Sequence, residues 1–478
     1  MSSSPNTTQV VGQWLLNFKR HTSTNLRDDP NYYLSRPETL VTTSQPQKLL
    51  IGTGKQIFRD ILPVFLSAKY EIILVTCFWA KSPSQAALAD ALRVLSSRCA
   101  SEGRRIRVRI CFSSVSLWQK LTQTSSLSGK EHAPSSWESL LGLPKPCELG
   151  GLDIRIRSIF IWPFSIMHPK FVIIDREVLF LPSCNVSWEN WLEGCIQLRG
   201  GIVEQALLFW MNFWARGERD VLKPLSVDQL GSEHRNTTSS SSVSHSLAIY
   251  PQGGLFEAPL DSMGAVPTIL LPSPHHRNPS FRLMPWSSPA PPPPTPLNTF
   301  LTTAIDTATR SIYIQSPNVN SPPILSAIAR ALVQGVDVRI ISNVNMMIIE
   351  QLATAGTRTE SALRKLYSKW MRGETRSRHL QDVEAAMPRP GKLEIFYYEA
   401  VPPDKAKSGA VEPAKSHLKL TIVDEEIVVL GSGNMDRASW YTSQELGVAF
   451  ISRQLAKVVM DGVNKNLEGR LRNAFPAK

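Results

Sequence analysis

Cysteine, charge and long apolar runs are all scarce in this sequence. It has six cysteines in 478 residues, all in the first half and none in a Cys-x-x-Cys pair: Cys77, Cys99, Cys111, Cys147, Cys184 and Cys195. This pattern excludes a disulfide-rich secreted framework and a zinc site built on paired cysteines, so we expect reduced, mostly buried thiols. Charged residues make up 19% and hydrophobic residues 42%, which is typical of a globular protein with a sizeable core.

No uninterrupted stretch of about 18 apolar residues is present, so no transmembrane span is expected. We expect no secretory leader either. The first apolar patch, with Val10, Trp14 and Phe18, has helical spacing and is followed by basic residues. We interpret it as a packing helix, with an interfacial helix or a mitochondrial presequence as the alternatives. The sequence therefore predicts an intracellular protein, cytoplasmic or peripheral to a membrane, with a mitochondrial location as the alternative.

Acidic residues are outnumbered by basic ones. The chain has 52 Lys and Arg against 40 Asp and Glu, a net charge of +12 and a pI of about 9.5. This balance favours an anionic partner, such as a nucleic acid, an acidic membrane surface or a phosphate-bearing substrate. A basic surface without a specific partner explains the charge equally well, so charge alone does not identify the partner.

An internal repeat organises the chain. An apolar run at 72–76 precedes a helical segment at 85–100 and an alternating run at 105–111, which predicts a strand, a helix and a second strand. The same order recurs within residues 312–341. Strands that alternate with helices predict an α/β fold with two similar layered halves.

Composition also suggests where the halves begin and end. Residues 239–242 are a serine run and residues 289–296 are almost all proline, so neither can join a packed core. The predicted segments are an N-terminal extension at 1–44, a first half at 45–221, a low-complexity linker at 222–296 and a second half at 297–478. A short apolar run at 266–271 inside the linker predicts a first strand of the second half.

One pattern of candidate catalytic residues occurs twice. It is His-x-Lys followed after four residues by Asp: His168, Lys170 and Asp175 in the first copy, and His417, Lys419 and Asp424 in the second. Each copy opens an apolar run that predicts a strand, on which residues two apart face the same side. Each histidine therefore shares a face with its lysine. Each aspartate should face away, which favours a structural role over direct participation.

Two further polar side chains follow each motif, 15 and 17 residues after its histidine: Ser183 and Asn185 in the first copy, and Ser432 and Asn434 in the second. Because they too are two residues apart, each pair can reach a common site. Two such copies inside a repeated order of strands and helices are not a chance match. The remaining alternative is a polar strand end that was duplicated without activity.

On these residues the chain resembles the phospholipase D superfamily. His-x-Lys-x4-Asp with a downstream Gly/Pro-Ser-x-Asn is that family's signature, and the segment from Gly431 to Ser439 is similar to the cardiolipin-synthase and bacterial phospholipase D type. The resemblance covers about residues 45–220 and 265–460, and the long linker is similar to that of fungal members. It implies a duplicated α/β/α sandwich, with two mixed-sheet halves and one active site at their interface. Since both motifs lie in one chain, we expect a monomer.

The resemblance also implies a glutamate beyond each motif that orients a histidine. Glu445 lies 11 residues after the second asparagine and fits this role. The first copy departs from the family pattern, with Pro182 in place of glycine and a shortened segment after its asparagine. There Glu193 follows the asparagine by eight residues, and Glu189 is its rival.

Phosphodiester cleavage explains these residue types. A neutral imidazole can attack phosphorus without charge repulsion, and a protonated imidazole can give a proton to the leaving oxygen. Lys170 and Lys419 can neutralise the non-bridging oxygens, and the serines and asparagines can donate hydrogen bonds to them. Because the lysines supply positive charge, we expect no metal and no other cofactor. The sequence does not distinguish the histidines; the resemblance implies that His168 is the nucleophile, forming a phosphohistidine, and that His417 is the acid and then the base.

Three functions compete for this site. The first is hydrolysis of phospholipids or phosphatidyl transfer at a membrane surface, favoured by apolar and aromatic residues near the motifs: Phe160, Ile161, Trp162, Phe164, Met167, Trp188, Trp191, Trp440 and Tyr441. Each of these rings can equally be a core residue. The second is cleavage of nucleic acid, favoured by the net charge and by Lys405, Lys407 and Lys415. The third is a non-enzymatic phosphate-binding scaffold, which the intact histidine–lysine pairs disfavour. We therefore predict a phospholipid phosphodiesterase or phosphatidyltransferase.

Overall fold

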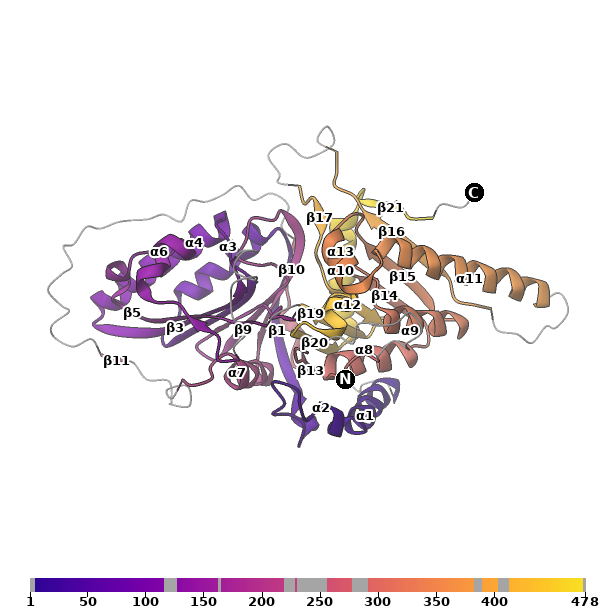
Figure 1. The fold of residues 1–478 in the computed structure, drawn as a ribbon, viewed down its shortest axis with the longest axis horizontal. Coiled ribbons are helices and arrows are strands. Elements are labelled where there is room, and N and C mark those ends of the chain that lie inside the picture. Colours follow the sequence, from indigo (N-terminus) through magenta and orange to yellow (C-terminus); the bar gives the residue numbers. More distant parts are fainter. Residues whose placement is uncertain are drawn as a thin grey trace.

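The computed structural model describes residues 5–115, 127–161, 165–218, 228–229, 256–276, 291–381, 389–402 and 412–475. Two α/β units lie side by side, one formed by the first half of the chain and one by the second (Figure 1). The described segments on either side of the predicted linker thus form two units of the same kind.

The first unit is built on a mixed sheet with the strand order β5–β3–β2–β8–β9–β10–β1. The strands are β1 (Val41–Gly52), β2 (Glu71–Phe78), β3 (Arg104–Ser114), β5 (Leu152–Ser158), β8 (Phe171–Ile174), β9 (Val178–Pro182) and β10 (Trp191–Arg199). Strands β2, β3 and β5 are parallel and the other pairs are antiparallel. The strands predicted at 72–76 and 105–111 are confirmed as parts of β2 and β3.

The second unit repeats this topology, with the order β16–β15–β14–β18–β19–β20–β13. Its strands are β13 (Val266–Ser273), β14 (Ser311–Gln315), β15 (Asp337–Ser342), β16 (Leu393–Tyr398), β18 (Leu420–Val423), β19 (Ile427–Gly431) and β20 (Glu445–Ile451). Strand β13 contains the apolar run at 266–271. It also pairs with the start of β1, where Val41 faces Ile269 and Ser44 faces Val266, so backbone pairing continues from one unit into the other.

Helices cover both faces of each sheet, which gives the expected α/β/α layering (Figure 1). In the first unit these are α3 (Gly54–Leu66) and α4 (Pro83–Ser101) on one face and α7 (Gly201–Phe213) on the other. Their counterparts in the second unit are α8 (Pro296–Asp306), α9 (Pro322–Val333) and α13 (Arg453–Leu467). The segment predicted as helical at 85–100 lies inside α4.

Smaller elements complete the described chain. They are α1 (Pro5–Lys19), α2 (Thr22–Asn25), β4 (Lys130–Glu131), α6 (Trp137–Leu141), β6 (Phe160–Ile161), β7 (Ser165–Ile166), β11 (Asp228–Gln229), β12 (Phe256–Pro259), α10 (Ile348–Ala355), α11 (Thr359–Gln381), β17 (Lys415–Ser416), α12 (Arg437–Tyr441) and β21 (Leu471–Asn473). The long helix α11 extends outward from the second unit (Figure 1). No helix among the described residues combines the length and the apolarity that a membrane crossing requires.

The N-terminal helix α1 packs against the second unit. Val10, Trp14 and Phe18 are buried, and the Trp14 indole donates hydrogen bonds of 3.2 Å to the Pro296 carbonyl and to the Thr299 hydroxyl of α8. An apolar helical stripe whose side chains are buried, with the indole N–H hydrogen-bonded, is part of the core. The predicted packing helix is therefore confirmed.

Candidate active site

The two motifs start at matching places in the two units. Each histidine and its lysine come directly before a short, fully buried strand, β8 in the first unit and β18 in the second. The His168 amide donates to the Gln444 carbonyl at 3.0 Å, and the His417 amide donates to the Leu192 carbonyl at 2.8 Å. Each acceptor belongs to the other unit and directly precedes a glutamate. These reciprocal backbone contacts bring each motif to the glutamate of the opposite half.

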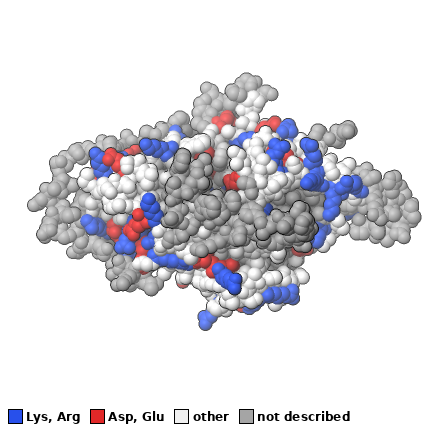
Figure 2. Space-filling view, in the orientation of Figure 1, with Lys and Arg blue, Asp and Glu red and all other residues white. Residues whose placement is uncertain are grey.

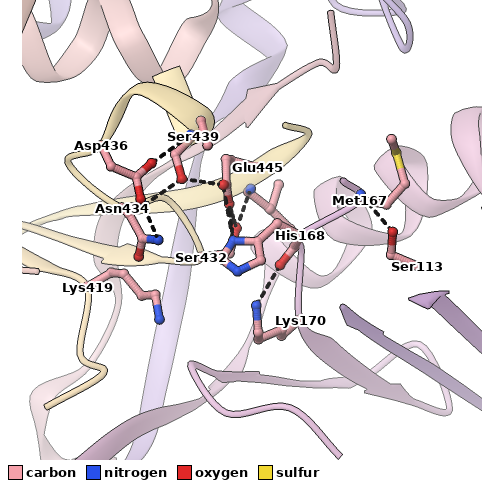
Figure 3. A network of polar contacts seen from close by, with 12 residues as sticks. Ser113, Met167, His168, Lys170, Lys419, Ser432, Asn434, Asp436, Ser439 and Glu445 are labelled. Atoms are coloured by element: carbon pink, nitrogen blue, oxygen red, sulfur yellow. Dashed lines mark hydrogen bonds and ion pairs between the residues drawn. The ribbon is translucent and has the colours of Figure 1, made fainter. Parts of the chain in front are cut away.

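The glutamates and histidines pair crosswise. His168 Nδ1 lies 2.8 Å from Glu445 Oε2 (Figure 3), and His417 Nδ1 lies 2.8 Å from Glu193 Oε1. Both carboxylates are buried. Glu193 is therefore the glutamate of the first half that contacts a histidine, whereas its rival Glu189 has a buried Oε2 without a partner among the described residues. A carboxylate on Nδ1 fixes the tautomer and leaves Nε2 of each ring for chemistry.

The lysines are buried beside the histidines. Lys170 Nζ donates to the His168 carbonyl at 2.8 Å, and Lys419 Nζ donates to the His417 carbonyl at 2.7 Å. Figure 3 shows both amines near the His168 ring. Each ammonium keeps further N–H donors beyond its one carbonyl contact. Two buried cations beside two imidazoles form a site for an anionic group such as a phosphodiester.

The serines contact the glutamates. Ser183 donates to Glu193, and Ser432 donates to Glu445. In this structure each hydroxyl hydrogen is directed at a carboxylate, and donation of these hydroxyls to a phosphate stays a prediction. Ser439, which the sequence reasoning did not single out, also donates to Glu445 at 2.6 Å (Figure 3). The serines thus position the carboxylates that hold the histidines.

The asparagines differ from the serines. Asn434 donates to Asp436 at 3.1 Å, and its own Oδ1 is buried without a partner among the described residues. Asn185 accepts a hydrogen bond of 3.3 Å from the Phe78 amide through Oδ1. Because its carbonyl oxygen takes that bond, the Asn185 amide nitrogen can donate to a ligand.

Asp175 and Asp424 lie away from the histidines, at the other ends of strands β8 and β18. Asp175 accepts hydrogen bonds from the amides of Lys69, Tyr70 and Glu71 at 2.7–2.9 Å. Asp424 accepts from the matching amides of residues 309–311 at 2.7–3.2 Å. These contacts agree with the structural role favoured by the sequence: the motif's aspartates fasten a turn to a neighbouring strand.

The two histidine–glutamate pairs, called dyads below, differ in the pKa of their carboxylates because of burial and neighbouring charge. Burial raises the pKa of Glu193 to about 7. For Glu445, burial acts in the same direction, but His168 and the hydrogen bonds from His168 and two serines outweigh it and hold the pKa below its ordinary value. Burial and the nearby Lys419 and Lys170 hold the pKa of His417 well below its ordinary value. Glu445 is thus the ionised partner at neutral pH, and Glu193 can carry a proton.

Burial also lowers the pKa values of two basic groups of the site, Lys419 and His168. It lowers the pKa of Lys419 to about 7. It also lowers the pKa of His168, against the attraction of Glu445. A buried imidazole of lowered pKa is neutral at physiological pH, as a nucleophile must be. Within the described residues, no group of three or more His, Cys, Asp or Glu side chains is placed to hold a metal ion.

The aromatic and apolar residues near the motifs divide into core and surface. Phe160, Ile161, Met167, Trp440 and Tyr441 are buried, so of the two alternatives left open for these residues they are core residues. The Trp191 ring lies against the His417 ring, with centroids 4.7 Å apart, and Trp188 is 66% exposed. Trp162, Phe164, Lys405 and Lys407 lie outside the described residues, and Lys415 Nζ donates to the Val344 carbonyl at 2.9 Å.

Comparison with known proteins agrees with this architecture. Residues 301–466 match the family model of the cardiolipin synthase, phospholipase D-like domain. The structure of phosphatidylserine synthase from Haemophilus influenzae Rd KW20 is similar over 92% of this chain and 90% of that chain, at 13% identity and a TM-score of 0.53. No curated protein matches the sequence.

Two further solved structures share less with this chain. Nuc, a phospholipase D family member from Salmonella typhimurium, is 18% identical, over 38% of this chain and 91% of that chain, with a TM-score of 0.26. Polyphosphate kinase from Porphyromonas gingivalis is 11% identical, over 88% of this chain and 50% of that chain, with a TM-score of 0.45. The family match and the phosphatidylserine synthase structure suffice for the class: the chain has the phospholipase D-like fold, and its second half carries a phospholipase D-like domain of the cardiolipin-synthase kind.

Proposed function

We propose that the protein cleaves the phosphodiester of a phospholipid, or transfers its phosphatidyl group, through a covalent phosphohistidine. The observation that carries this proposal is the crossed pair of histidine–glutamate dyads with two buried lysines beside them. Members of the phospholipase D superfamily are phosphodiesterases or transferases. The acceptor that completes the reaction, water or an alcohol, decides between hydrolysis and transfer.

The properties of the two dyads support an assignment of roles. The His168 side chain is 15% exposed, against 4% for His417, so a substrate reaches it more readily. Glu445 remains a carboxylate and polarises the His168 ring through Nδ1, which strengthens Nε2 as a nucleophile. Glu193 can hold a proton near neutral pH and pass it to His417. We therefore assign His168 as nucleophile and His417 as acid and base.

The proposed reaction has two balanced steps. His168 Nε2 attacks phosphorus, the bond from phosphorus to the leaving oxygen breaks, and His417 gives that oxygen its proton. Water or an alcohol then attacks the phosphohistidine, its proton passes to His417, and the phosphorus–nitrogen bond breaks. Lys170 and Lys419 stabilise the negative charge that grows on the non-bridging oxygens. The Asn185 amide is a further candidate donor to these oxygens.

A phosphate ester with a good leaving group tests these roles, because p-nitrophenolate needs no proton. We expect His168→Ala to abolish turnover of every phosphodiester. His417→Ala should retain measurable cleavage of a p-nitrophenyl phosphodiester, and mass spectrometry should find the trapped adduct on the peptide that contains His168. An adduct on the His417 peptide would reverse the roles, and no adduct with equal residual activities would refute the covalent route.

The substrate class needs a separate comparison. Purified protein should be incubated with phosphatidylglycerol, phosphatidylcholine and single-stranded DNA, with His168→Ala as the control for contaminating activity. We expect lipid head groups to be released and DNA to remain intact. The net charge of +12 also suits a nuclease. Cleavage of DNA with a steep loss at high salt, and no lipid product, would establish that alternative instead.

A further inference from the structure

Helix α10 carries two large apolar side chains on its solvent-facing side. Ile349 is 85% exposed and Leu352 is 50% exposed, and residues three apart are neighbours on a helix surface. The helix is held by its other side, where Gln351 is buried. Apolar side chains that cluster on a surface without a packing role are a feature of surfaces that contact another molecule.

The next helix, α11, adds positive charge, and its first residue is joined to α10, because Thr359 donates to Gln351 Oε1 at 2.7 and 2.9 Å. Arg364, Lys365, Lys369 and Arg372 are exposed, and none of the four has an ion-pair partner among the described residues. Residues 361–373 contain no Asp or Glu. Figure 2 shows Lys and Arg side chains gathered over the part of the molecule where α11 lies. Between Glu360 in its first turn and Glu374, this helix therefore presents four cations and no carboxylate.

Hydrogen bonds join α10 to the active site at both of its ends. Before the helix, Asn343 exchanges two hydrogen bonds, of 2.7 and 2.9 Å, with the backbone of Ser416, which directly precedes His417. At its end, the Thr354 carbonyl accepts a hydrogen bond of 3.0 Å from Arg437. Arg437 begins helix α12, which also carries Ser439. A molecule that binds the outer side of α10 would therefore be held by a helix that is hydrogen-bonded to the segments carrying His417 and Ser439.

We propose that the surface made by Ile349 and Leu352 of α10 and by the four exposed cations of α11 docks the protein on an anionic phospholipid membrane. The inference rests on the proposed phospholipid function and names the lipid surface on which that site would work. Apolar side chains enter the acyl boundary while cations contact anionic head groups, so a membrane uses both parts of this surface. A nucleic acid would use only the cations, and the apolar pair would remain in water.

Vesicle sedimentation tests the docking surface. The full chain should sediment with phosphatidylcholine vesicles that contain phosphatidylglycerol, and much less with phosphatidylcholine alone. Replacement of all four cations (R364Q, K365Q, K369Q, R372Q) should weaken binding to the anionic vesicles by about fivefold for each charge removed. The double variant I349S/L352S should weaken binding to both kinds of vesicle.

Two matched controls separate this surface from general effects of charge and exposure. The variant R20Q/R27Q/R36Q/K457Q has the same net charge as the quadruple variant but loses cations elsewhere. The variant L26S/V333S removes two other exposed apolar side chains, which are 63% and 73% exposed. Both controls should bind anionic vesicles like the unaltered protein. Equal loss in the controls, or unchanged binding in the α10 and α11 variants, would overturn the proposal.

Activity assays keep this inference separate from the proposed function. On a short-chain phospholipid below its micelle concentration, the α10 and α11 variants should turn over substrate at the rate of the unaltered protein. On anionic vesicles they should be slower in proportion to their lost binding. If the unaltered protein cleaves neither lipid form, the proposed function fails, and sedimentation still decides whether the surface docks. Loss of single-stranded DNA binding with unchanged vesicle binding would overturn the proposal in favour of a nucleic acid.

Discussion

The two glutamates that hold the histidines have different hydrogen-bond partners. Glu445 accepts from two serines and a histidine, whereas Glu193 accepts from one serine and a histidine among the described residues. The additional serine is Ser439. In the first copy, which is shorter after its asparagine, no second serine donates to Glu193 among the described residues. An extra donor stabilises an ionised carboxylate, which explains why burial protonates Glu193 more readily than Glu445.

This inequality predicts the pH dependence of the reaction. Burial places the pKa of both Glu193 and Lys419 at about 7. Below that pH the Glu193–His417 pair holds the proton that the leaving oxygen needs, and Lys419 keeps its positive charge. Above it both are lost, so kcat/KM on a phospholipid should fall as pH rises through about 7. Initial rates on a short-chain phospholipid across this range provide the measurement.

A substrate whose leaving group needs no proton separates the effect of the Glu193–His417 proton from the effect of the Lys419 charge. A p-nitrophenyl ester needs no proton, so for this substrate only the loss of the Lys419 charge should remain, seen as a smaller fall in kcat/KM. Glu193→Gln cannot ionise, so its kcat/KM on the phospholipid should be low and should fall through this pH range only as far as the Lys419 charge dictates. An identical pH profile for the unaltered protein and Glu193→Gln would show that Glu193 does not control the acid.

At the scale of elements, the motif's aspartates have a mechanical role. Asp175 and Asp424 have φ angles of 52° and 53°, and the residue after each also has a positive φ, which defines a tight turn between two antiparallel strands. Each carboxylate accepts hydrogen bonds from the amides that open the neighbouring strand, β2 or β14. The equal spacing between lysine and aspartate in the two copies is thus the length of a short strand.

We therefore expect Asp424→Asn to affect stability rather than chemistry. Asparagine tolerates the positive φ but removes the charge and directs an amide at backbone N–H groups, which should lower the free energy of unfolding by about 1–3 kcal/mol. Thermal denaturation gives the stability, and kcat measured well below the transition should be unchanged. Glu425→Ala, in the same turn but exposed, is the matched control. A large loss of kcat without loss of stability would restore Asp424 to the catalytic group.

Patterns of neighbouring residues predict the helices and strands, whereas the candidate site depends on contacts between residues that are far apart in the sequence. The apolar runs of β2 and β3, the helix α4 and the strands after both motifs follow from period and spacing, which depend on neighbouring residues. The crossed dyads join residues 277 and 224 positions apart. No local pattern states which half supplies a carboxylate. The contacts of Ser183 and Ser432 with the glutamates are equally hidden from a local pattern, since their acceptors lie on an adjacent strand.

At the scale of the whole molecule, each unit completes the other. Strand β10 of the first unit supplies Glu193 to the histidine of the second, and β20 returns Glu445 to the histidine of the first. Short parallel pairing of β10 with β17 (Trp191 with Lys415, Leu192 with Ser416) holds this junction together. Among the described residues neither unit alone contains a histidine with its carboxylate, so the candidate site requires both units.

Because both units belong to one chain, a single molecule should suffice for catalysis. We expect His168→Ala and His417→Ala to remain inactive on a phospholipid when they are mixed, with an activity no greater than the sum of the two measured separately. If two chains shared their sites, the mixture would form sites with both histidines intact and recover activity. Unaltered protein mixed with either variant is the control and should show activity proportional to its own amount. Sedimentation velocity on the same samples should show one monomeric species, and recovery on mixing together with a dimer would refute the single-chain site.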